Sequence, residues 1–293
     1  MCHAHATSRE HVPPKNLFPE AKDVNGADYR INLITVRSCD DHNTEKSHDD
    51  EFLMVSLAGI IGNNSIGYVH RLGKVDRAIR NSAHRLLDQV VVERKAVHQI
   101  QSGGNLFHEV IWGTPDVHRL KRCFTHIGFG LHQHHFHTRF SGHIEVLLGY
   151  LFHSDHNAKT LVEFIRDRAA IDLEGKPRFG SNQDIFFYQV AAPDQFNLSL
   201  MKLVFYGGLE VYLAFIPESV SRPTHLGFEL LAHGVKLVIS LGDKAYTFEP
   251  RGQTQALKKS GAINDCTIAS PRRPPATTSQ TPPAPKAAPP DTN

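Results

Sequence analysis

The stretch Asn32-Leu33-Ile34-Thr35-Val36-Arg37-Ser38-Cys39-Asp40-Asp41-His42-Asn43 shows how the first part of this chain is organised. Residues 32–36 are mostly aliphatic or β-branched, which predicts a strand. Asp40 and Asp41 suit the N-terminus of a helix, because carboxylates stabilise the positive end of the helix dipole. We therefore expect a strand that leads into a helix over residues 40–57.

Two pairs of possible metal ligands lie on either side of this strand. Cys2 and His5 are three residues apart, and Cys39 and His42 repeat the same spacing. Zn²⁺ prefers four nitrogen or sulfur ligands in a tetrahedron, and two close pairs from distant parts of a chain can supply them. The alternative is that two unrelated cysteines have chance histidine neighbours, because His occurs 20 times in the chain.

Glu10 and His11 lie between the two pairs and are adjacent in the sequence. A neutral histidine is a good general base near pH 7, and a carboxylate suits a hard divalent cation such as Mg²⁺. The amide oxygen of Asn43 suits the same cation, and an Asn at position 32 can orient the imidazole from across a hairpin. The alternative is a capping or core histidine next to a solvated glutamate.

These residues carry a resemblance to a known family. Ser8-Arg9-Glu10-His11-Val12-Pro13-Pro14-Lys15, Phe18-Pro19, residues 32–36, Ser38-Cys39, His42-Asn43, Lys46-Ser47 and Asp49-Asp50-Glu51-Phe52 match motifs of a bacterial branch of the HNH endonucleases. The resemblance covers residues 1–52, and it implies a small ββα-metal module that hydrolyses nucleic-acid phosphodiester bonds, DNA in particular.

The resemblance also implies a role for each matching residue. His11 would activate the attacking water, and Asn32 would position His11. Glu10 and Asn43 would hold a catalytic Mg²⁺ or Mn²⁺. Structural zinc would be held by Cys2, His5, Cys39 and His42. The site would thus be a His-Asn-Asn variant of the family pattern.

The chain departs from the family at its first zinc pair. His5-Ala6 stands where the family has Cys-Gly, and the first ligand is at position 2. Histidine can replace cysteine on zinc, so one expectation is an intact site of lower affinity. The other is a damaged zinc site and a weak nuclease.

Composition limits the class of protein. A hydrophobic content of 40% allows a sizeable core, and a net charge of +2 does not describe a generally basic nucleic-acid-binding protein. Four cysteines at this length do not make a disulfide framework, and no secretory signal or stretch of roughly 20 apolar residues is present. We therefore expect a cytoplasmic protein.

Residues 59–255 are expected to form an α+β domain that we do not assign to a family. Lys74–Ile100 has an approximate helical stripe and predicts one long helix, on which Arg77 and Arg80 are candidates for phosphate contact, together with Lys46. A solvated face is the other interpretation. Further expected elements are a short basic helix at 117–124, a helix at 157–170, and strands at 106–112, 183–191, 198–206, 209–216, 236–241 and 245–248.

Two other stretches have distinctive compositions. The histidines within 132–137 would alternate on a strand, which predicts either packing and surface histidines or a second metal site. Residues 256–293 are assigned to a disordered tail, with Pro, Ala, Thr and Ser prevailing from Ser270 onward.

The sequence therefore predicts a nuclease module at 1–58, an α+β domain at 59–255 that selects substrate or joins protomers into a homodimer, and the tail. The alternative is a zinc-stabilised nucleic-acid-binding or sensor protein whose nuclease site is degenerate.

Overall fold

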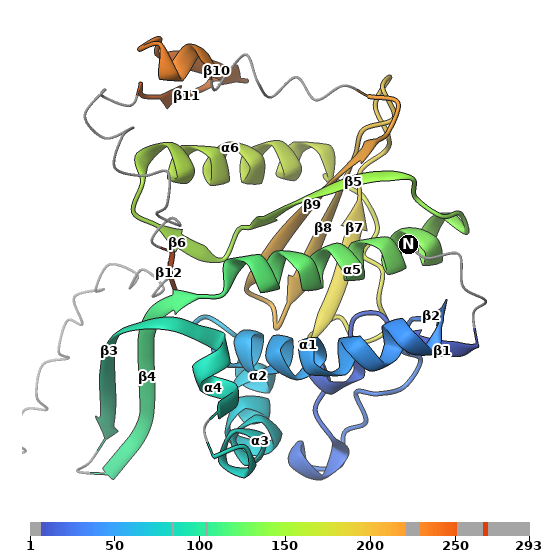
Figure 1. The fold of residues 1–293 in the computed structure, drawn as a ribbon, viewed down its shortest axis with the longest axis vertical. Helices are drawn as coiled ribbons and strands as arrows, with labels where there is room; N and C mark the ends of the chain where they lie inside the picture. Colours follow the sequence, from blue (N-terminus) through green and yellow to red (C-terminus); the bar gives the residue numbers. More distant parts are fainter. Residues whose placement is uncertain (1–6, 84, 103–104, 221–228, 251–265, 269–293) are drawn as a thin grey trace, which may run out of the picture.

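The computed structural model describes residues 7–83, 85–102, 105–220, 229–250 and 266–268, and only the backbone of 40–46, 94–102, 105–112 and 266–268. The chain mixes helices and strands as predicted (Figure 1). The predicted ligands Cys2 and His5 lie outside the described residues. So does the predicted tail, apart from strand β12 (Cys266–Ile268), which pairs with β6 (Leu151–His153).

The chain begins with two paired strands and a helix. Strand β1 (Ser8–His11) runs antiparallel to β2 (Thr35–Ser38), and helix α1 (Asp40–Ala58) follows after Cys39. The predicted helix at 40–57 is thereby confirmed. The connection between the two strands contains the short 3-10 helices Lys15–Leu17 and Ala21–Asp23.

A four-stranded antiparallel sheet lies on the far side of α5 from the paired strands and α1 (Figure 1). Its strands are, in order across the sheet, β5 (Gly142–Leu148), β9 (Leu209–Pro217), β8 (Ser199–Phe205) and β7 (Phe186–Val190). Alternate residues of β9 enter two different clusters: Leu213 belongs to the main core, whereas Tyr212 packs with Ala169 and Leu173 from the region of α6. Helices α5 (Val117–Phe136) and α6 (His156–Asp172) therefore cover opposite faces of the sheet (Figure 1).

Helix α5 (Val117–Phe136) lies between the sheet and the first elements of the chain. A Cβ atom at Gly128 would lie 3.0 Å from Leu213, and one at Gly130 would lie 2.8 Å from Val12. Helix α5 therefore approaches the sheet closely at Gly128, and it approaches Val12, the residue after β1, closely at Gly130. One hydrophobic core accordingly runs from Val12 and the C-terminal part of α1 to the sheet, across the predicted domain boundary between residues 58 and 59.

The prediction of one helix over Lys74–Ile100 is wrong. A π-helical turn (Arg71–Val75) follows α2 (Ser65–His70), and then come α3 (Asp76–Asn81), α4 (Arg85–Val90) and strand β3 (Val91–Ser102). Ala83 has a φ of 51° and interrupts the helical path. The three consecutive valines at 90–92 favour a strand, and pairing with β4 (Asn105–Pro115) satisfies the backbone of β3.

The expected strand of alternating histidines at 132–137 is also wrong, because α5 continues through Phe136 and His137 adopts a left-handed conformation. The buried residues Leu120, Phe124, Ile127 and Leu131 have helical spacing, and this stripe extends the helix beyond the predicted end at 124. His132 and His135 make ring contacts with Phe215 and Phe179 respectively, so both are packing residues.

The remaining predicted elements are found. Helix α6 and the strands β4, β7, β8 and β9 lie close to their expected positions, and Gly207-Gly208 separates β8 from β9. A second hairpin, β10 (Leu237–Leu241) and β11 (Lys244–Phe248), is also confirmed. Within the part of the chain that is described, no helix has the length and apolar character needed to cross a membrane.

Candidate active site

Glu10 and His11 end strand β1 and are held there by the ladder with β2. Glu10 pairs with Val36 and His11 with Thr35. The next residue, Val12, donates its backbone N–H to the carbonyl of Ile34 at 2.9 Å, and its side chain is buried in the core. The backbone of Glu10 and His11 is therefore held by its pairing with β2 and by the hydrogen bond of the following residue, Val12.

A cleft of about 580 Å³ lies beside these two residues. One wall comes from the end of β1 and the residues after it, and the other comes from the middle of α1. The lining residues are Arg9, Glu10, His11, Pro14, Lys15, Asn16, Ser47, His48, Asp50 and Glu51. The fold thus brings the predicted base and the predicted metal ligand Glu10 into one cleft with part of α1.

The electrostatics of the cleft suit a neutral imidazole at His11. Partial burial lowers the pKa of His11 below 6.5, and the positive charge of Lys15 lowers it further. A neutral imidazole can accept a proton, which is the state that a general base requires. Arg9 and Lys15 add positive charge to the cleft, and Glu10, Asp50 and Glu51 add negative charge.

The wall of the cleft that follows β1 is held by two buried side chains. His70 is fully buried on α2, and its Nε2 lies 3.0 Å from the backbone carbonyl of Asn16. Tyr206 is also fully buried, and its hydroxyl donates to the carbonyl of Leu17 at 2.6 Å. The short turn that contributes Lys15 and Asn16 to the cleft is therefore attached to the domain behind it.

The segment after this turn is held by a cluster of charges around Glu20. Lys22, Lys74 and Arg30 approach its carboxylate at 2.7, 3.2 and 3.5 Å. The hydrogen bond from Lys22 is the largest cause of a pKa of about 2 for Glu20, and the charges of Lys74 and Arg30 add to it. Arg30 also donates to the carbonyl of Phe18.

Helix α1 carries the other predicted ligands. Cys39 is buried at its N-cap, while the side chains of His42, Asn43 and Lys46 lie outside the described part of the structure. Residue 43 precedes Ser47 by one helical turn, so its backbone lies on the same side of α1 as the cleft-lining Ser47 and Glu51. Residue 42 likewise lies one turn after Cys39.

Asn32 is not among the residues that line the cleft with His11. It lies in a turn with a φ of 53°, and its carbonyl accepts a hydrogen bond from Ser181 at 2.9 Å. Asn32 lines a separate, much smaller cavity of about 10 Å³, together with Val12 and Gly180. Between these two described residues there is no hydrogen bond from the Asn32 side chain to His11. The positioning role of Asn32 stays a prediction.

The two arginines predicted to contact phosphate are engaged by carboxylates. Nη2 of Arg77 lies 2.9 and 2.8 Å from the carboxylate oxygens of Asp23, and Arg80 pairs with Asp76 on its own helix. Each guanidinium would have to share or exchange its acidic partner in order to bind a phosphate. Their role in nucleic-acid binding also stays a prediction.

Sequence reasoning did not assign a role to several residues of the cleft. Lys15, Asp50 and Glu51 stand within the motifs that carry the resemblance, and that position was a usable signal. His48 and the buried His70 had no local signal. His48 faces residues after β1 across the cleft, and His70 contacts the carbonyl of Asn16, a residue 54 positions away.

The donor sets fit the two implied metals in part. A buried thiol at the N-cap of α1 suits zinc, and the first described residue, Thr7, donates its N–H to the carbonyl of Ser38, next to Cys39. The carboxylate of Glu10 in an open, charged cleft suits a hard cation. No group of three or more His, Cys, Asp or Glu ligands is found among residues whose placement is described.

Comparisons with family models, with curated proteins and with solved structures found no match for this chain.

Proposed function

We propose that the chain is a metal-dependent endonuclease of the HNH type that hydrolyses phosphodiester bonds in nucleic acid, with DNA as the expected substrate. One observation carries the proposal: Glu10 and His11 line the same cleft as Ser47 and Glu51 of the helix that follows the paired strands. The order of β1, β2 and α1 supports the ββα module that the resemblance implies. The metal-binding, zinc-clamped form of that module is part of the proposal.

The chemistry assigned to His11 is proton abstraction. An imidazole nitrogen of His11 takes a proton from a water, whose oxygen forms a bond to phosphorus while the bond to the 3′ oxygen breaks. The 3′ oxygen takes a proton from solvent water, so the products carry a 5′ phosphate and a 3′ hydroxyl. The lowered pKa of His11 keeps the imidazole ready to accept this proton at neutral pH.

The other cleft residues bind and orient the substrate. Arg9 and Lys15 attract the phosphate backbone, and the ladder between β1 and β2 holds His11 in place. Glu10 and Asn43 would hold a divalent cation, which when bound neutralises the phosphate and the charge on the leaving oxygen. Cys39, with Cys2, His5 and His42, would hold structural zinc at the start of α1.

The proposal is tested by incubating the purified full chain with supercoiled plasmid, with and without added Mg²⁺ or Mn²⁺, and by measuring bound zinc. We expect nicking that requires the added cation, product ends with a 5′ phosphate and a 3′ hydroxyl, and about one zinc per chain. Bound zinc without cleavage of plasmid, single-stranded DNA or RNA would reject the proposal in favour of a nucleic-acid-binding protein with a degenerate nuclease site.

A further inference from the structure

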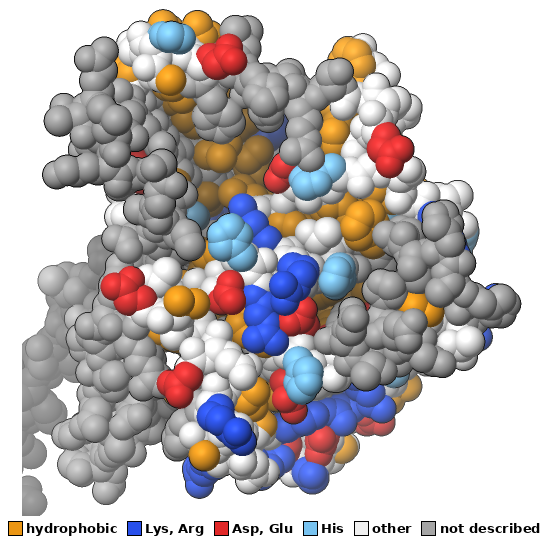
Figure 2. Space-filling model, in the orientation of Figure 1, with side chains coloured by type: hydrophobic (Ala, Val, Ile, Leu, Met, Phe, Trp, Pro, Cys, Tyr) orange, Lys and Arg blue, Asp and Glu red, His pale blue; other side chains and the backbone are white. Residues whose placement is uncertain are grey.

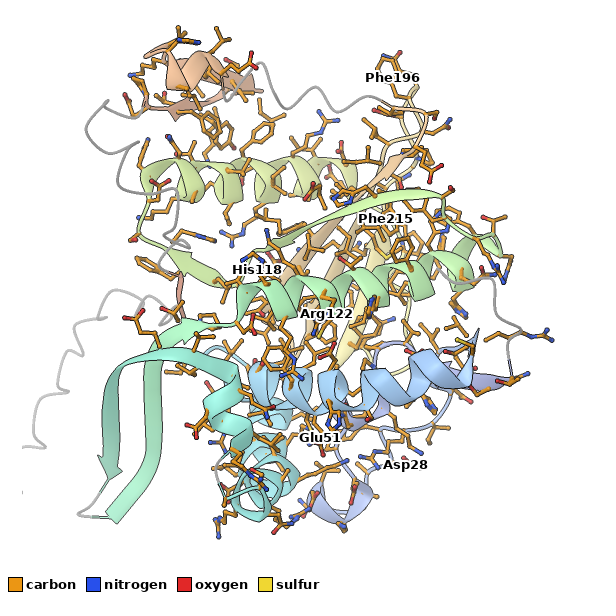
Figure 3. The ribbon with its side chains drawn as sticks, viewed as in Figure 1. Asp28, Glu51, His118, Arg122, Phe196 and Phe215 are labelled. Atoms are coloured by element: carbon orange, nitrogen blue, oxygen red, sulfur yellow. The ribbon has the colours of Figure 1, made fainter. Side chains whose placement is uncertain are left out.

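Helix α5 begins with a group of basic side chains that contact α1, the helix that lines the cleft. Lys121 and Arg122 are exposed on its first turns, and Arg119 is partly buried beside them, with His118 also exposed nearby. We call the lysine and the two arginines the α5 cationic surface. Figure 2 shows Lys and Arg side chains, with histidines near them, gathered at the centre of this face, and Figure 3 labels His118 and Arg122 among them.

The α5 cationic surface is attached to the helix that lines the cleft. Nε of Arg119 lies 2.8 Å from Oδ1 of Asp49, and Nη2 of Arg122 lies 3.2 Å from the same oxygen. Arg119 also donates through Nη2 to the carbonyl of His48 at 2.9 Å, and His48 lines the cleft. The surface and the cleft are thus on two sides of α1, separated by about the width of one helix, roughly 10 Å.

The charge of this surface is only partly balanced by nearby acids, because its three basic side chains face the carboxylates of Asp49 and Asp116. Two guanidinium groups share the single carboxylate of Asp49, and no ion pair among the described residues involves Lys121. The sequence has no Asp or Glu between Asp116 and Glu145, and Asp116 uses its side chain to cap α5. Arg122 keeps 56% of its side chain exposed. The surface therefore keeps an excess of positive charge even though its two arginines bind Asp49 of α1.

We infer that the α5 cationic surface binds the sugar-phosphate backbone of the nucleic acid on the side of α1 away from the cleft. The inference rests on the proposed function, because it assigns the polyanion from the chemistry proposed for the cleft. A strand that leaves the cleft and crosses α1 would reach Arg122 and Lys121 after about the width of one helix, roughly 10 Å. Arg9 and Lys15 alone face three acids in the cleft, so the additional cations would supply the affinity that the cleft lacks.

The inference is tested by binding rather than by cleavage. The full chain with His11→Ala is titrated, without added divalent cation, into fluorescently labelled single-stranded and duplex DNA at several salt concentrations. Lys121→Gln and the double variant Lys121→Gln/Arg122→Gln are compared with the control Lys176→Gln/Lys236→Gln. The control is matched because Lys176 is exposed and Lys236 pairs with Glu249 at 3.1 Å, much as Arg122 pairs with Asp49.

We expect the double variant to bind at least about tenfold more weakly near 0.1 M salt. The slope of log K against log salt should fall by roughly one for each phosphate that the protein no longer neutralises. The control should bind as the parent does. Lys121→Gln breaks no ion pair within the described structure, so its result holds even if thermal unfolding shows that the double variant is destabilised.

Two outcomes would overturn the inference: unchanged affinity and salt slope in both α5 variants, or no binding of DNA by the parent. Neither outcome decides the nuclease proposal, which depends on cleavage by the unmodified chain. Conversely, weaker binding by the α5 variants together with no cleavage would support this surface and reject the nuclease.

Discussion

Nε2 of His70 lies 3.0 Å from the backbone carbonyl of Asn16, so a fully buried imidazole holds the turn that forms one wall of the cleft. Because a carbonyl only accepts, Nε2 carries the hydrogen, and Nδ1 has no hydrogen-bond partner in the described part of the chain. Burial lowers the pKa of His70 to about 4, against the opposing effect of the bond to Asn16.

This contact predicts that stability depends on pH in a defined range. Between pH 6.5 and about 4 the unfolded chain binds a proton at His70 and the folded chain does not, so the free energy of unfolding falls as the pH is lowered through this range. The expected contribution is about 3 kcal/mol, fully present above pH 6.5. Urea unfolding at pH 7, 5.5 and 4.5 measures it. His70→Gln should show a smaller decrease, and an identical decrease would contradict the assignment.

A second prediction separates Cys39 and Cys123, the two cysteines whose side chains the structure describes. Cys39 is buried at the N-cap of α1, whereas burial raises the pKa of Cys123 to about 12, which disfavours the thiolate that binds metal. We expect Cys39→Ser to lose bound zinc and Cys123→Ser to keep it, as measured by metal analysis of the purified chains. Equal zinc content in the two variants would show that Cys39 is not a ligand.

The ion pairs of Asp49 should contribute to stability. Burial would raise the pKa of Asp49, but hydrogen bonds from Arg122 and Arg119 more than offset this and lower it. Asp49→Asn leaves the partly buried Arg119 without its anion, and we expect a loss of about 2 kcal/mol by thermal unfolding. The exposed pair of Arg80 and Asp76 is the control, because Arg80→Gln should cost less than about 1 kcal/mol. Similar losses in both variants would contradict this difference.

The close approach of α5 to Val12 predicts a loss of activity from a small substitution. The Cβ of Gly130→Ala would lie 2.8 Å from Cγ2 of Val12, so Val12 or the helix must shift, and Val12 is next to His11. We expect the cleavage rate of the variant to fall about tenfold or more, because small displacements of a base are costly. Gly73→Ala is the control, since its Cβ would meet Asp23 at an ordinary 3.5 Å. An unchanged rate in Gly130→Ala would show that His11 does not depend on this packing.

The sequence predicted the local parts of this structure. The helix after Cys39, helix α6 and the hairpin at Gly207-Gly208 all depend on patterns within a few residues of each other. The strand expected at residues 32–36 is found instead at Thr35–Ser38, because Asn32 lies in a turn. The helix expected at 74–100 failed because β3 is stabilised by pairing with β4, which a helical stripe does not reveal. The prediction that α5 ends at residue 124 was wrong because the C-terminal half of this helix is stabilised by tertiary packing. It contacts Leu213 of the sheet on one side and Val12 on the other.

For the site, the sequence predicted Glu10 and His11 because they form a local motif. It did not predict the α1 wall at His48, or His70 behind Asn16, because these residues meet the cleft only through tertiary packing. Asn32 is the opposite case, because its motif predicted a place in the site and a distant contact determines where it lies. The carbonyl of Asn32 accepts a hydrogen bond from Ser181, a residue 149 positions away.

The most direct test of the account is the initial rate at which supercoiled plasmid is nicked in Mg²⁺ or Mn²⁺ by the unmodified chain, by His11→Ala and by His143→Ala. His143 is an exposed histidine that bonds to Glu145 and has no place in the cleft. We predict that His11→Ala lowers the rate by about 10²-fold or more while His143→Ala leaves it unchanged. Nicking by His11→Ala at the rate of the unmodified chain would contradict the assignment of this cleft as the active site.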